Sequence, residues 1–250
     1  KPEEIRRELE KALYLSVNGR PGPVWIDIPL DIQGSKIDPD TLEGYMPTEQ
    51  PDYAPKQADI DVIVEKLKTA KRPVIYAGNG IRIADAYPEF SQLVEVLQIP
   101  VVTAWNSIDL MATEDSCYAG RGGTMGDRAG NFAVQNSDFL LSLACRLNLY
   151  QSGYDVKTWA RAAYTVVVDI DPYELKKPTI RVDKPVCCDV KQLMVRLTES
   201  WQKQGAATDC EAWKKQCQIW KKKYPVAQSK HYKAEKANVY AFVDLSLIHI

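Results

Sequence analysis

The sequence predicts a doubly wound α/β protein whose central sheet has six mostly parallel strands. Between residues 57 and 204, short apolar runs alternate with segments in which apolar residues recur at helical spacing. The runs are apolar at nearly every position, which is typical of strands covered on both faces. Each run is followed by enough chain for a crossover helix, and this alternation favours parallel pairing with helices on both faces of one sheet.

The first elements precede this alternation. Residues 5–16 are predicted to form an amphipathic helix, with a proline and two glutamates in its first turn and Gly19 beyond its end. Residues 20–23 are predicted to form a turn, and residues 24–28 a short strand that ends at a proline. Four prolines and little apolar periodicity then predict an extended linker over residues 34–56.

The alternating region continues with elements of both kinds. A long glycine-rich loop is expected over residues 105–126, and the sequence from Asp171 has three signals of a helix start: an acidic cap, a proline and a glutamate. Further helices are predicted after Asp189 and Gly205. Five of the six expected strands can be placed, at residues 73–77, 100–104, 139–144, 164–170 and 185–188, and the remaining predicted helices are residues 60–67, 90–97 and 129–135.

Composition excludes several classes of protein. The 32 Lys and Arg residues against 33 Asp and Glu residues give a net charge of −1, so the basic excess of most nucleic-acid-binding proteins is absent. No apolar run approaches the roughly 20 residues of a membrane-spanning helix. We therefore expect a cytoplasmic protein with neither nucleic acid nor a membrane as partner. With no C-x-x-C pair and only two histidines, we expect no metal site and six reduced cysteines.

The first candidate binding residues follow the first strand of the alternating region, because ligands of a doubly wound sheet bind at the carboxyl ends of its strands. Gly78-Asn79-Gly80 could turn tightly and approach a phosphate closely. A dinucleotide fingerprint would need a third glycine at Ile83 and an acidic residue where the next strand ends in Thr103. The pattern gives little support to NAD, and a simple tight turn is the alternative.

Other candidates lie after later strands. Residues 120–127 are rich in glycine and precede a predicted helix, so their amides could cradle an anion, or the loop could simply be mobile. Asp169 or Asp171 could bind ribose or adenine, although capping is the main role expected of Asp171. Arg146 could pair with a diphosphate or lie on the surface without a ligand. No Ser-His-Asp set, Walker loop or glycosidase-type carboxylate pair is present, so no catalytic residue is predicted.

Several motifs occur in a characteristic order. Residues 19–29 read Gly-Arg-Pro-Gly-Pro-Val-Trp-Ile-Asp-Ile-Pro, and residues 71–80 run from Lys-Arg-Pro-Val to Gly-Asn-Gly. Residues 99–103, 136–141 and 168–172 read Ile-Pro-Val-Val-Thr, Asn-Ser-Asp-Phe-Leu-Leu and Val-Asp-Ile-Asp-Pro. In this order and spacing, the chain from residue 1 to about residue 197 resembles thiamine-diphosphate-dependent enzymes of the acetolactate synthase type.

The resemblance implies a three-domain enzyme that joins a carbanion derived from pyruvate to a second 2-oxo acid, using thiamine diphosphate and magnesium, as a homodimer or homotetramer. The catalytic glutamate and the metal motif would lie outside this chain, so the chain alone is expected to be inactive. By this resemblance, residues 1–33 end a pyrimidine-binding domain, 34–56 are a linker, 57–204 are the central nucleotide-binding-like domain, 205–238 are a helical linker, and 239–250 are the truncated start of a diphosphate-binding domain.

The family's central domain binds FAD in a structural role, and related enzymes bind ADP there or leave the domain empty. Past Arg146 the family typically has Phe-Asp-Asp-Arg, whereas this sequence has Leu147-Asn148-Leu149-Tyr150. The loss of these charged groups implies weak binding of FAD or ADP. Carried over by motif, the contacts fall on Gly78, Asn79, Gly80, Thr103, Gly123, Met125, Gly126, Arg146, Asp169, Asp171 and Asp189.

The alternative interpretation is a stand-alone nucleotide-binding or interaction module without catalysis. Such a module should not begin with an orphan helix and strand, nor finish inside the new apolar element that starts at residue 239. Part of a larger enzyme is therefore the preferred hypothesis, with the acceptor 2-oxo acid left open.

Overall fold

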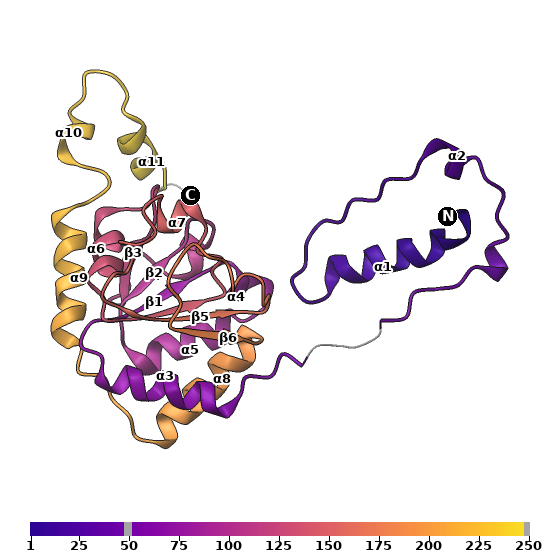
Figure 1. Cartoon of the computed structure of the whole chain (residues 1–250). Coiled ribbons are helices and arrows are strands. Elements are labelled where there is room, and N and C mark those ends of the chain that lie inside the picture. Colours follow the sequence, from indigo (N-terminus) through magenta and orange to yellow (C-terminus); the bar gives the residue numbers. More distant parts are fainter. Residues whose placement is uncertain (48–51, 248–250) are drawn as a thin grey trace.

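A computed structural model describes residues 1–47 and 52–247 of the chain (Figure 1). Six strands form one sheet in the order β3-β2-β1-β4-β5-β6, and all neighbouring strands are parallel. This arrangement confirms the predicted doubly wound sheet. The strands are β1 (Pro73–Ala77), β2 (Val101–Thr103), β3 (Tyr118–Arg121), β4 (Phe139–Leu143), β5 (Tyr164–Asp169) and β6 (Lys184–Cys187).

The two central strands, β1 and β4, show why continuous apolar runs in the sequence predict strands of this sheet. In the register of β1 and β2, Ile75 lies opposite Val101, and in the register of β1 and β4, Tyr76 lies opposite Ser142. Every residue of β1 and β4 is buried. Strands buried on both faces are apolar at consecutive positions, because neither face meets water.

Helices cover the sheet in two groups (Figure 1). In one group α8 packs against both α3 and α5, and in the other α6 and α9 pack against each other and against β3. Each helix buries an apolar stripe, as the helical spacing predicts. These helices are α3 (Gln57–Thr69), α5 (Tyr87–Leu97), α6 (Arg128–Asn136), α8 (Val190–Lys203) and α9 (Glu211–Lys223).

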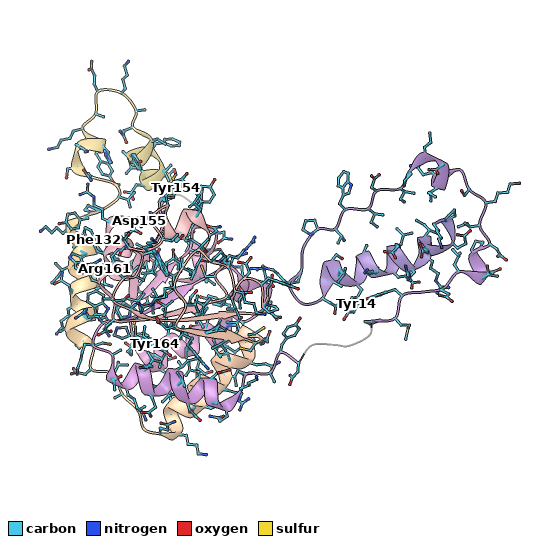
Figure 2. The ribbon with its side chains drawn as sticks, in the orientation of Figure 1. Tyr14, Phe132, Tyr154, Asp155, Arg161 and Tyr164 are labelled. Atoms are coloured by element: carbon cyan, nitrogen blue, oxygen red, sulfur yellow. The ribbon has the colours of Figure 1, made fainter. Side chains whose placement is uncertain are left out.

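The remaining helices are short or lie toward the chain ends. The longest of them, α1, packs beside residues 42–45, where the Tyr14 and Tyr45 ring centroids are 5.6 Å apart. Figure 2 shows Tyr14 well away from the sheet. These elements are η1 (Pro2–Glu4), α1 (Ile5–Val17), α2 (Leu30–Gln33), η2 (Pro39–Thr41), α4 (Gly80–Ile83), η3 (Trp105–Leu110), α7 (Leu149–Ser152), α10 (Ser229–Tyr232) and α11 (Val239–Leu247).

Residues 205–238, which we predict to link two domains, contain α9. The buried Trp213 side chain of this helix donates its indole N–H to the carbonyl oxygen of Pro73 at 3.1 Å, and Cys217 is also buried. This helix therefore contributes to the same hydrophobic core as the sheet.

The predicted strand over residues 24–28 is wrong. The structure assigns this segment to neither a helix nor a strand, and the Trp25 side chain is 92% exposed. A strand needs the backbone of a neighbouring strand as hydrogen-bond partner, and the described residues place none beside it. Four residues of the predicted linker, 48–51, lie outside the described residues, as do residues 248–250 after α11.

Two other predictions also need correction. The helix expected from Asp171 is only a turn, in which Asp171 Oδ1 accepts the amide of Tyr173 at 2.9 Å. The backbone before Pro178 disfavours helical geometry, which leaves room for little more than one turn. The loop expected over residues 105–126 contains η3 and the edge strand β3, whose glycine and arginine interrupt any apolar run. Among the described residues, no helix is long and apolar enough to cross a bilayer.

Candidate functional site

A cleft of about 740 Å³ opens at the carboxyl edge of the sheet. It lies where β1 and β4 are neighbours, and from these strands the strand order proceeds in opposite directions. Such a switch point is the usual ligand site of a doubly wound sheet, because adjacent loops diverge there. The residues after β1, β2, β4 and β5 contribute to the lining.

The structure brings together part of the predicted site. The predicted residues that line the cleft are Asn79, Gly80, Met125, Arg146, Asp169 and Asp189. Those that do not line it are Gly78, Thr103, Gly123, Gly126 and Asp171. Thr103 is fully buried and lies 3.3 Å from the Tyr118 hydroxyl, so its oxygen is engaged inside the sheet.

The glycine turn after β1 packs tightly against the end of β4. Gly78 donates its amide to Leu143 at 2.9 Å, and Gly80 donates to Ala144 at 3.2 Å. A Cβ on Gly80 would lie 2.6 Å from the Ala144 Cβ, and one on Gly78 would collide with the Ala144 carbonyl. The ends of β1 and β4 approach so closely that neither Gly78 nor Gly80 has room for a side chain. Gly80 also lines the cleft.

The glycine-rich loop after β3 uses its amides within the chain. The amides of Gly122, Gly123, Thr124 and Gly126 donate to protein oxygens at 2.7–3.1 Å. Asp127 Oδ1 accepts the amide of Gly130 at 2.7 Å and caps α6. These bonds give the loop a defined shape, and its residue Met125 lines the cleft.

One end of the cleft is charged. Asp169 is 3% exposed, and its Oδ1 accepts the amide of Asp171 at 3.0 Å. Burial raises the pKa of Asp169 above its ordinary value, although the Asp171 amide and the Arg20 charge partly oppose this shift. The Arg20 guanidinium lies 3.6 Å from Asp169, 3.7 Å from Asp171 and 3.1 Å from Glu174.

Arg146 and Glu174 continue this charged end. Two nitrogens of Arg146 lie 2.7 Å from Glu174 Oε1, and Lys177 Nζ lies 2.6 Å from Glu174 Oε2. Burial favours the neutral form of Glu174, but hydrogen bonds from Lys177 and Arg146 outweigh it and lower the pKa of this carboxyl. Arg146 therefore shares the single negative charge of Glu174 with Lys177 and Arg20.

Sequence reasoning missed Arg20, Glu174 and the aromatic end of the cleft. Trp105 and Tyr150 line that end, with ring centroids 6.3 Å apart and planes at 88°. Position after a strand was a usable signal for Trp105, which directly follows β2 and Ala104. No local signal marks Arg20, because its partners lie far along the chain and meet it only in the folded structure.

The cysteines do not provide a reactive group at the cleft. Cys145 lines it, but burial raises the pKa of this thiol to about 12, so it stays protonated at neutral pH. All six cysteines are unpaired, and five are buried. Within residues 1–47 and 52–247, no group of three His, Cys, Asp or Glu side chains is placed to hold a metal ion.

Comparisons with known proteins give a consistent result. Residues 60–197 match the family model described as thiamine pyrophosphate enzyme, central domain. The acetolactate synthase large subunit of Corynebacterium glutamicum is 33% identical over 211 residues, which cover 83% of this chain and 33% of that protein. A probable acetolactate synthase large subunit of Methanocaldococcus jannaschii is 33% identical over 198 residues, covering 78% of this chain and 33% of that protein.

A third relative extends the comparison. Acetolactate synthase isozyme 2 large subunit of Escherichia coli is 31% identical over 175 residues, which cover 70% of this chain and 31% of that protein. The chain thus spans about a third of the length of the curated relatives it matches.

Proposed function

Because the chain belongs to the thiamine pyrophosphate enzymes and contains their central domain, we propose that it is part of an acetolactate-synthase-like enzyme whose central cleft holds FAD or ADP. The observation that carries the proposal is the cleft at the sheet's switch point, with the buried Asp169 carboxylate and the arginines Arg20 and Arg146 along one end.

The residues present fit an adenine nucleotide. Asp169 lies at the end of β5, where a carboxylate accepts hydrogen bonds from ribose hydroxyls. The guanidinium groups of Arg20 and Arg146 can donate to diphosphate oxygens. Both arginines line the cleft, and each lies within 3.1 Å of Glu174. A diphosphate would therefore compete with a carboxylate for the same donors.

This competition, together with the sequence, supports weak binding. Leu147-Asn148-Leu149-Tyr150 stands where the resembled family typically has two aspartates and an arginine. A charge-assisted hydrogen bond contributes about 1.5–3 kcal/mol, so two losses lower affinity by roughly two to four orders of magnitude. The isolated chain should then purify without a yellow flavin.

For the whole enzyme we propose carboligation or decarboxylation of 2-oxo acids such as pyruvate, in the cytoplasm, by a homodimer or homotetramer. Thiamine diphosphate, when bound with magnesium in such an enzyme, stabilises the carbanion formed from pyruvate. The chain spans about a third of the length of the relatives it matches, and we propose that the thiamine diphosphate site, the metal and the general base belong to the rest of the enzyme.

Calorimetric titration of the 250-residue chain with FAD and with ADP tests the nucleotide cleft. We expect dissociation constants in the micromolar to millimolar range, and about a tenfold loss of affinity in Arg146→Ala. The matched control is Arg161→Ala, because Arg161 donates to the Gln135 carbonyl and does not line the cleft (Figure 2).

Two results would contradict the proposal. Tight, stoichiometric binding of FAD would refute the proposed weak affinity. Absence of heat from either nucleotide at millimolar concentration would leave the cleft without its proposed ligand.

A further inference from the structure

The edge strand β3 has backbone groups that β2 does not use. In the sheet order β3 is terminal and lies beside β2. The Val101 amide of β2 donates to the Cys117 carbonyl, directly before β3, at 2.8 Å. Because successive backbone groups of a strand point to opposite sides, the N–H and C=O of Tyr118 point away from β2. Such outward groups are a template for the addition of another strand.

Two side chains of α9 bind the outward carbonyl oxygens of β3 and of the chain before it. Gln218 Nε2 donates to the carbonyl of Ser116 at 2.8 Å and to that of Tyr118 at 3.0 Å. Lys221 Nζ donates to the carbonyl of Thr113 at 2.6 Å and to that of Tyr118 at 2.9 Å. The Tyr118 carbonyl therefore accepts two hydrogen bonds from α9, in the position where a further strand would donate a backbone amide.

Asp127 closes the other end of β3. The Gly122 amide donates to Thr103 of β2 at 3.1 Å, so the backbone of the preceding residue, Arg121, faces outward. The Arg121 amide donates to Asp127 Oδ2 at 2.9 Å, and the Arg121 carbonyl accepts the Asp127 amide at 3.1 Å. The outward groups of β3 are thus closed by Asp127 at Arg121 and by α9 at Tyr118.

The helix α9 is held against the sheet by other residues. Its Trp213 side chain is buried in the core and bonds to the β1 backbone. Toward α6, the ring centroids of Trp220 and Phe132 are 5.6 Å apart (Figure 2). Replacement of Gln218 or Lys221 should therefore leave α9 in place and uncover the carbonyl oxygens of β3.

Lys221 is the stronger barrier of the two side chains. Its ammonium group has three donors and no acceptor, so it satisfies carbonyl oxygens but offers nothing to the amides of an approaching strand. Its nitrogen also lies 5.1 Å from the centroid of the Tyr118 ring. Two copies that met at this edge would bring two ammonium groups together, and like charges at a contact are unfavourable. Lysine protects sheet edges in many proteins in this way.

We propose that Gln218 and Lys221 close β3 against strand addition, and that removal of both side chains lets β3 pair with the β3 of a second copy of this chain. A second copy fits because Tyr118 directs one amide and one carbonyl to the same side, and two such residues can exchange both hydrogen bonds in an antiparallel pair. In that pair the Tyr118 amide leaves the Asp115 carbonyl, to which it donates at 3.1 Å here. The pairing needs neither a nucleotide nor thiamine diphosphate.

Sedimentation velocity of the 250-residue chain over a range of concentrations tests the pairing. For the double variant Gln218→Ala/Lys221→Ala we expect an average mass that rises with concentration to about twice that of wild type, because an antiparallel β3 pair joins two copies and leaves no β3 free. The matched control, Gln216→Ala/Lys222→Ala, removes the same residue types from α9. In the described part of the chain, the β3 carbonyls bond to neither of these control side chains.

Hydrogen exchange locates the contact, and circular dichroism verifies that each variant is folded. In the double variant the Tyr118 amide should exchange more slowly as concentration rises, whereas in wild type its rate should stay constant. If the double variant unfolds, Gln218→Ala and Lys221→Ala are measured singly and should associate at higher concentration.

Three results would overturn the proposal. The first is a folded variant whose mass stays equal to that of wild type at every concentration. The second is association that leaves hydrogen exchange across residues 116–121 unchanged, because another surface would then make the contact. The third is equal association of the control variant, which would show that β3 is not specifically uncovered.

Discussion

At the scale of single residues, the environment of Asp169 has a clear effect on the protonation of its carboxyl group. The carboxyl is 3% exposed, and burial raises its pKa above the ordinary 3.8. When folding raises the pKa of an acid, the folded state binds the proton more tightly than the unfolded state. The resulting contribution to stability is present below the ordinary pKa and is lost as pH rises through the raised pKa.

Asp169→Asn should therefore raise the melting temperature at pH 7, where wild-type Asp169 is ionised in a desolvated site. The difference should disappear near pH 3, where the wild-type side chain is protonated. Thermal unfolding followed by circular dichroism at both pH values measures it. Asp209→Asn is the control, because the Asp209 side chain is 84% exposed and should change the melting temperature little. A lower melting temperature for Asp169→Asn at pH 7 would show that the Arg20 contact outweighs desolvation.

Site residues were predictable where they directly follow a strand. Asn79, Arg146 and Asp169 lie at or just beyond the ends of strands, and all three line the cleft because parallel strands bring their carboxyl ends to one edge. Arg20 and Glu174 could not be found from local sequence, because their importance arises from an ion-pair cluster that only the tertiary structure assembles. The ligand contacts of all these residues stay predictions.

At the scale of secondary-structure elements, the turn from β1 into α4 depends on the absence of a side chain at Gly80. A Cβ there would lie 2.6 Å from the Ala144 Cβ and 2.8 Å from its carbonyl oxygen. Both atoms belong to Ala144, the residue directly after β4, whose amide donates to the Val168 carbonyl at 2.9 Å and so ties its backbone to β5. Gly80→Ala should therefore lower the free energy of unfolding by about 1–3 kcal/mol, as overpacking does.

Urea denaturation of the two proteins measures this loss. The control is Gly22→Ala, because a Cβ on Gly22 would meet no atom within 4 Å. A loss for Gly80→Ala no larger than that for Gly22→Ala would mean that the two strand ends separate easily.

Element prediction succeeded where burial on both faces imposed a continuous apolar run, as in β1 and β4. It failed at β3, which lies at the sheet edge and contains Gly120 with a φ of +125°. It also failed for residues 24–28, whose apolar composition suits a strand but whose partner strand is absent from the described residues. Local composition specifies a tendency, and pairing decides whether a strand forms.

At the scale of the whole molecule, the purified 250-residue chain should make no acetolactate from pyruvate, even with excess thiamine diphosphate and magnesium. We propose that the general base and the diphosphate anchor belong to parts of the enzyme beyond these 250 residues, and lacking either one should lower the rate by about two orders of magnitude or more. A colorimetric acetolactate assay measures this, with an intact acetolactate synthase as positive control. Turnover above a no-protein blank would place an active site inside this chain.

The family was also predictable at this scale, because several weak motifs agree in order and spacing from residue 19 to residue 172. No single motif would suffice. The order of helices and strands along the chain can be predicted from the sequence alone. The cleft and its two chemically different ends cannot, because they depend on side chains that meet only after folding.

The position of Arg20 links the turn at residues 19–21 to the local electric field at the cleft. Arg20, Arg146 and Lys177 balance three carboxylates, those of Asp169, Asp171 and Glu174. If the turn moved away, this cluster would keep all its acids and lose one cation, and its net charge would become negative. A phosphate would then be repelled. The affinity for a nucleotide would then depend on the position of residues 19–21. The turn at these residues and the charged end of the cleft, which lie far apart in sequence, are coupled electrostatically in this way.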